Sequence, residues 1–185
     1  MENVVLGLLI IQNLTLYELN QTFKQGISVF YSASFGSLQI AIKNLLNKGM
    51  IVFEERVEKG RNKKIYSITE HGKDAFYKWM LEDIPVNKLE VTALSKVYFL
   101  GLLQNDAQRK QIILEILGKI QLVQTELENM HEEISRMEIP ESYMEILKYQ
   151  LRTLDYGQMS HSFAREWFLG LLNDLNASPE EPGSE

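Results

Sequence analysis

The spacing of apolar residues changes within the first 85 positions, and this change predicts helices followed by a pair of strands. Leu38, Ala41, Ile42 and Leu45 recur at the three- and four-residue steps of a helix that is buried on one face. The segment 63–68 alternates instead, as a strand does. The predicted helices span 2–12, 16–26, 34–48 and 70–81, and the predicted strands span 50–55 and 63–68.

Capping residues support these boundaries. Thr15 stands three residues before Glu18, which is the arrangement of a capping box at a helix start. Ser34 and Thr69 are expected to cap the next helices, and Gly49 is expected to end the helix that Ser34 begins. Three helices, a two-stranded hairpin and a further helix form the order of a winged helix-turn-helix.

Residues 86–176 are expected to be entirely helical. One helix is predicted over 91–103, a longer one from an Asp106 cap to about Met137, and a third from Glu141 to about Leu175. The fold class is therefore mainly α, with an α+β winged-helix domain over 1–85 and an all-α domain over 86–176. The tail 177–185 is rich in Pro and Glu and is expected to be disordered.

The long helix carries a sustained heptad of apolar residues. Such a seam can pack against the last helix of its own chain or against a second copy, and we predict a homodimer. The seam residues are Ile113, Ile116, Ile120, Val123, Leu127, Met130 and Ile134.

Charge is distributed unevenly. The net charge of the whole chain is −6, but residues 16–80 carry ten Lys and Arg against six Asp and Glu. Because an acidic surface repels a phosphate backbone, any contact with DNA is expected in the N-terminal half.

Several classes of protein are disfavoured by the sequence. The chain has no cysteine, and its three histidines form no metal-binding pair, so neither a metal nor another cofactor is implied. The apolar run 4–11 is too short to span a bilayer and lacks the features of a signal peptide, so a cytoplasmic location is expected. No catalytic motif is present, so we expect that the protein is not an enzyme.

The predicted third helix offers the groups that a major-groove reader needs. Short hydroxyls at its start suit phosphate oxygens, whereas longer polar side chains further along suit base edges. These serines can equally be helix caps, and Lys43 and Asn44 can belong to a solvated face. The candidate DNA-binding residues here are Ser32, Ser34, Ser37, Gln39, Lys43 and Asn44.

The predicted hairpin tip concentrates positive charge. Arg61, Lys63 and Lys64 are candidates for contact with the DNA backbone or minor groove, and Lys59 adds a fourth cation. The alternative interpretation is that lysines protect an exposed strand edge from pairing.

Three motifs resemble the PadR family of winged-helix transcriptional regulators. The segment 32–51 (SASFGSLQIAIKNLLNKGMI) is similar to that family's third helix, and 60–72 (GRNKKIYSITEHG) is similar to its wing. Leu6-Gly7-Leu8-Leu9, followed by Tyr17-Glu18-Leu19, resembles its first two helices. The resemblance implies a DNA-binding repressor that dimerises through its C-terminal helices and binds a palindromic operator. It also implies that Trp167 in the last helix takes part in dimerisation.

Two other functions stay open. Phe35 and Leu38 depart from the family pattern and, with the acidic balance, favour a winged helix that binds a protein instead of DNA. Tyr149, Tyr156 and Phe163 are spaced by seven and can line a pocket for a small aromatic effector, or can belong to the core and dimer interface.

Overall fold

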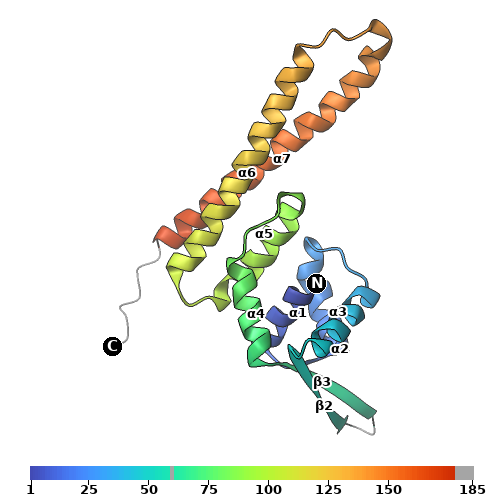
Figure 1. Cartoon of the computed structure of the whole chain (residues 1–185), viewed down its shortest axis with the longest axis vertical. Coiled ribbons are helices and arrows are strands. Elements are labelled where there is room, and N and C mark those ends of the chain that lie inside the picture. Colours follow the sequence, from blue (N-terminus) through green and yellow to red (C-terminus); the bar gives the residue numbers. More distant parts are fainter. Residues whose placement is uncertain (59–60, 178–185) are drawn as a thin grey trace. The chain divides into compact units, whose positions relative to one another are not determined.

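The computed structural model describes residues 1–58 and 61–177 and divides the chain into two compact units. Unit 1 comprises Met1–Asp83 and Glu90–Leu103, and unit 2 comprises Ile84–Leu89 and the chain from Gln104 onward. The mainly α fold class is confirmed (Figure 1). No helix within the described residues is long and apolar enough to cross a membrane.

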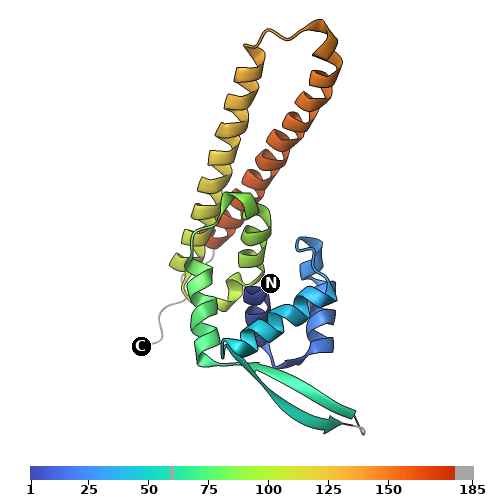
Figure 2. The same cartoon turned by 45° about the vertical axis from the view of Figure 1, so that its right-hand side comes forward.

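Unit 1 is a winged helix with one further helical segment. Its helices surround a core of aliphatic and aromatic side chains, and the hairpin projects beyond them (Figures 1 and 2). The elements in chain order are α1 (Glu2–Ile11), β1 (Leu14–Thr15), α2 (Leu16–Gln25), a 3-10 turn (Ile27–Val29), α3 (Phe35–Asn47), β2 (Ile51–Glu58), β3 (Arg61–Ile68), α4 (Glu70–Leu81), α5 (Leu89–Tyr98) and a second 3-10 turn (Leu100–Leu102).

The sheet has three antiparallel strands in the order β1-β3-β2. The long β2–β3 hairpin places Glu55 opposite Lys64, and the short β1 places Leu14 opposite Tyr66. The strand β1 was not predicted because two residues carry no alternating pattern. The predicted capping box is confirmed directly after β1, where Glu18 Oε2 accepts from Thr15 N at 2.8 Å.

The core of unit 1 extends past the predicted domain boundary at residue 85. The ring of Phe99 lies edge-on to Phe76 with centroids 5.6 Å apart, and a β carbon on Gly7 would lie 2.7 Å from the Phe99 ring. Residues 90–103 therefore pack with the winged helix, whereas we had predicted them in the C-terminal domain. Their apolar side chains complete this core. The spacing of apolar residues along the sequence does not show such a long-range contact.

Unit 2 is built on an antiparallel helical hairpin (Figures 1 and 2). Its helices are α6 (Asp106–Ser135) and α7 (Met144–Ala177), joined through a 3-10 turn (Glu141–Tyr143), and another 3-10 turn (Val86–Lys88) precedes α5. Asn105, and not Asp106, caps α6, because its Oδ1 accepts from Ala107 N at 2.8 Å. Helix α7 includes Ala177, the first residue of the predicted tail, and 178–185 lie outside the described residues.

The heptad of α6 is largely used inside the single chain. Ile113, Ile116 and Ile120 are at most 2% exposed, so they have no surface to offer a second copy, and the dimer contact predicted for them requires correction. Further along, Leu127 lies 3.5 Å from where a β carbon on Gly157 of α7 would stand. Val123, Leu127 and Ile134 are half-buried, and Met130 remains exposed. The seam thus serves mainly the α6–α7 contact.

Candidate nucleic-acid interface

The start of α3 is a hydrogen-bonded cap formed by two of the candidate serines. Ser34 Oγ accepts from Ser37 N at 3.1 Å, which confirms Ser34 as the N-cap. Ser37 Oγ donates to the Ser34 carbonyl at 2.7 Å. The hydroxyl hydrogen of Ser37 is therefore engaged, whereas the Ser34 hydroxyl makes only a 3.5 Å contact and keeps its donor accessible. Ser32 is exposed just before the helix.

Helix α3 has a buried face and an outward face. Leu38, Ala41, Ile42 and Leu45 are buried, as their spacing predicted. The outward residues are Gln39, Ile40, Lys43 and Asn47. Sequence reasoning missed Ile40, although projecting the sequence at 100° per residue would have placed it away from the buried face.

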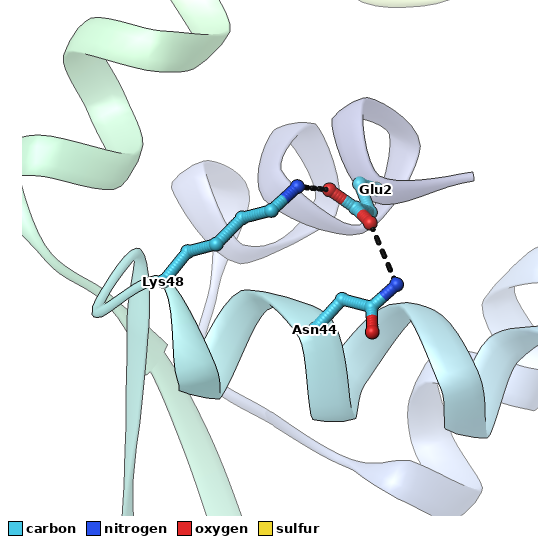
Figure 3. Close-up of polar contacts among 3 residues, drawn as sticks. All are labelled: Glu2, Asn44 and Lys48. Atoms are coloured by element: carbon cyan, nitrogen blue, oxygen red, sulfur yellow. Dashed lines mark hydrogen bonds and ion pairs between the residues drawn. The ribbon is translucent and has the colours of Figure 1, made fainter.

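Asn44 lies on neither face but contacts α1 (Figure 3). Its Nδ2 donates to Glu2 Oε1 at 3.0 Å, and Lys48 Nζ lies 2.6 Å from Glu2 Oε2. This contact corrects the predicted role of Asn44, because an amide held by a carboxylate of its own chain is not directed at a base. Figure 3 shows Glu2 bridging the two side chains of α3.

The contacts of this bridge lower the pKa of Glu2. Burial acts to raise the pKa, but the hydrogen bonds from Lys48 and Asn44, together with the positive charge of Lys48, outweigh it and lower the pKa overall. The bridge therefore holds the inner side of α3 against α1 when Glu2 is ionised.

The wing presents exposed lysines beside acidic neighbours. Lys63 and Lys64 are exposed on β3, and Lys64 Nζ lies 3.6 Å from Glu55 and 4.2 Å from the ring centroid of Phe53. The hydrogen bonds that Thr15 donates to Glu18 lower the pKa of that carboxylate, and the positive charge of Lys63 lowers it further. Lys59 lies outside the described residues, as does the side chain of Arg61.

The comparisons with known proteins agree with this architecture. Residues 5–78 match the family model described as the transcriptional regulator PadR-like family, a stretch that runs from α1 into α4 and contains the whole wing. Residues 5–78 thus form a PadR-like winged helix. The family consists of transcriptional regulators, a class of DNA-binding proteins and not of enzymes.

Individual relatives of this PadR-like chain include a negative regulator. The negative transcriptional regulator PadR of Bacillus subtilis (strain 168) is 25% identical over 141 residues, which are 75% of this chain and 77% of the relative. Among solved structures, B. subtilis PadR in complex with operator DNA is 20% identical, with coverage of 94% and 98% and a TM-score of 0.44. A PadR-like regulator from Bacillus cereus is 28% identical, with coverage of 94% of each chain and a TM-score of 0.43.

A winged helix that binds a protein through Phe35 and Leu38 would need both side chains to be exposed in one apolar patch. Leu38 is 3% exposed and belongs to the core, whereas Phe35 is 47% exposed. Only Phe35 is therefore accessible to a partner, so Leu38 does not support the interpretation of this site as a protein-binding patch.

Aromatic side chains of α7 form a stripe that faces solvent in the single chain. Tyr149, Tyr156 and Phe163 are 62%, 75% and 70% exposed, and Met159 between them is 73% exposed. Trp167 is half-exposed and lies edge-on to Phe168, with centroids 5.0 Å apart.

A shallow hollow does occur near the turn of the hairpin, and it excludes those aromatics. Its lining is mostly aliphatic, with methionines and one histidine: His131, Ile134, Ser135, Met137, Ile139, Met144, Leu147 and Leu151. The described residues also contain no cluster of three or more side chains suited to hold a metal ion.

Proposed function

We propose that this PadR-like chain is a repressor that binds a palindromic operator as a homodimer. Helix α3, with its cap, lies in the major groove over residues 34–48, and the wing over 59–64 contacts the backbone or minor groove. The outward face of α3 carries this proposal. Gln39 and Lys43 stand exposed on it, and among the described residues no carboxylate pairs with Lys43.

These two side chains have the chemistry of base recognition. A glutamine amide can pair with the N6 and N7 edge of adenine, and a lysine ammonium favours O6 and N7 of guanine. They lie four residues apart, so both project from the same side of the helix. Phosphates are met by Ser32, by the accessible donor of Ser34 and by the positive end of the helix dipole.

The wing supplies sequence-independent affinity in this proposal. Lys63 and Lys64 are exposed, and the 3.6 Å pairing of Lys64 with Glu55 is a solvent-accessible contact that a phosphate can replace. Arg61 is included from its sequence position beside the hairpin tip.

Fluorescence anisotropy tests the proposal. The protein is titrated with the duplex upstream of its own gene and with an unrelated duplex, each at two salt concentrations. We expect a clear preference for the upstream duplex and an affinity that falls steeply with salt. Substituting Gln39 and Lys43 by Ala should reduce the preference, since the base contacts of these side chains are made with the upstream duplex and not with the unrelated one.

The wing is tested by replacing Arg61, Lys63 and Lys64 with Ala. The salt slope should fall by up to about three counterions, with the preference between duplexes retained. Lys148→Ala removes one charge from α7 and serves as the control, for which an unchanged slope is expected. Equal binding of both duplexes by the wild-type protein at both salt concentrations would contradict the proposed recognition.

We also propose that the solvent-facing stripe of α7 pairs with a second copy, in place of the first half of the α6 heptad. Tyr149, Tyr156, Met159 and Phe163 are separated by seven, three and four residues, so they lie on one side of the helix. Several large apolar and aromatic side chains exposed on one side of a helix are characteristic of an association surface. A second copy suits it because like stripes can pair about a two-fold axis, and a two-fold dimer carries two copies of α3, one for each half of a palindrome.

A further inference from the structure

Ile40 lies on the α3 face that the proposed function places in the groove. At 100° per residue, it lies about 40° from Gly36 and about 60° from Lys43, nearly opposite the buried residues of the same helix. Its side chain is 62% exposed. An apolar side chain thus projects away from the core of the winged helix, among polar neighbours.

Neither packing nor helix formation accounts for an isoleucine at this position. An exposed side chain gains little from burial in its own chain, and β-branched residues form helices less readily than Ala, Lys or Gln. The neighbours Gln39 and Lys43 are polar, so Ile40 does not extend the core to the surface. The side chain is therefore available for a contact outside the chain.

We propose that Ile40 contacts the C5 methyl group of a thymine in the operator. This inference rests on the proposed function, because it assumes that α3 lies in the major groove. Thymine presents the one apolar group on the base edges of that groove. Gln39 suits adenine and Lys43 suits guanine, so an adjacent Ile40 adds recognition of a thymine that neither polar side chain provides.

Removing the methyl groups from the DNA tests this contact directly. Two versions of the duplex upstream of the gene are prepared, one with thymidine and one with deoxyuridine at every thymidine position. The wild-type protein, Ile40→Ala and the matched control Ile11→Ala are titrated with both by anisotropy. Ile11 is an exposed isoleucine of α1, which lies outside the proposed interface and is 57% exposed.

The wild-type protein should bind the deoxyuridine duplex more weakly, by about fourfold for each contacted methyl group. Ile40→Ala should bind the two duplexes with nearly equal affinity, and Ile11→Ala should discriminate between them as the wild type does. Ile40→Ala should also unfold at the same or a higher temperature, since alanine is the better helix former.

Discrimination by Ile40→Ala equal to that of the wild type would overturn the inference, since the methyl groups would then be recognised elsewhere. So would a wild-type protein that prefers its upstream duplex yet ignores the change to deoxyuridine. Failure of the wild-type protein to prefer the upstream duplex over the unrelated one is a different result, and it contradicts the proposed function itself.

Discussion

At the scale of single residues, Gly72 shows how tightly α4 approaches the strand that follows α3. A β carbon at this position would stand 2.1 Å from the Met50 carbonyl oxygen and 2.8 Å from Ile68. The same junction is held by Thr69, whose hydroxyl donates to the Gly49 carbonyl at 2.8 Å and accepts from Gly72 N at 3.1 Å. Only a residue without a side chain fits between the cap and the strand.

Gly72→Ala should therefore destabilise the protein by about 1–3 kcal/mol or more, because backbone atoms must shift to admit the methyl group. Urea unfolding followed by circular dichroism measures this loss. Gly118→Ala in α6 is the control, since nothing lies within 4 Å of its β-carbon position. That variant should gain up to about 1 kcal/mol from helix propensity. Equal unfolding midpoints for the two variants would show that the close approach at Gly72 costs nothing.

At the scale of elements, the bridge from Glu2 to Asn44 and Lys48 fixes α3 against α1. The side chain of Glu2 is 29% exposed and that of Lys48 is 51% exposed, so we expect the bridge to contribute only about 1 kcal/mol. The pKa of Glu2 is lowered in the folded state. Its contribution is therefore present above the pKa of the unfolded chain and is lost as the pH falls through the folded pKa.

Glu2→Gln should be less stable than the wild type at pH 7. The difference should begin to shrink as the pH falls through the ordinary glutamate pKa of about 4.3, and it should be lost below the lowered pKa of folded Glu2. Thermal unfolding between pH 3 and 7 measures both curves. Glu70→Gln is the control, because its pairing with Lys73 is an exposed contact within one helical turn. A stability difference for Glu2→Gln that stays constant across this pH range would exclude ionisation of Glu2 as its source.

The predictability of each element follows from the range of the contacts that form it. The caps at Thr15, Ser34 and Thr69 were predictable because each hydrogen bond joins residues three apart. The strand β1 was not, because its two residues are defined only by pairing with β3, about fifty positions later. Asn44 was misplaced for the same reason, since its partner Glu2 lies 42 residues away.

At the scale of the whole molecule, the heptad of α6 shows why a sequence pattern predicts an interface without identifying the partner. The same apolar repeat serves a helix of the same chain or of another, and here α7 supplies the partner for much of it. The second apolar row, on α7, is what remains exposed. Composition alone does not distinguish the two rows, because the burial of a row depends on whether it faces the other helix of the hairpin.

The α7 stripe is tested by placing a charge in it. Tyr156→Glu and Phe163→Glu should each convert a dimer into a monomer in light scattering, because a self-complementary interface would bury each new carboxylate without a partner. Helical circular dichroism should persist, since the opposite side of α7 still packs on α6. Val29→Glu is the control: Val29 is 87% exposed in unit 1, and this variant should stay dimeric.

DNA binding then separates loss of the interface from damage to the winged helix. A monomeric Tyr156→Glu protein should bind a duplex containing one half of the operator as the wild type does, and should lose affinity only for the complete palindrome. The complete site binds two linked copies of α3 and so gains affinity from their linkage, whereas half a site binds only one copy. Dimers that persist in both glutamate variants would refute the stripe as the interface. A wild-type protein that binds the palindrome as a monomer would refute the homodimer.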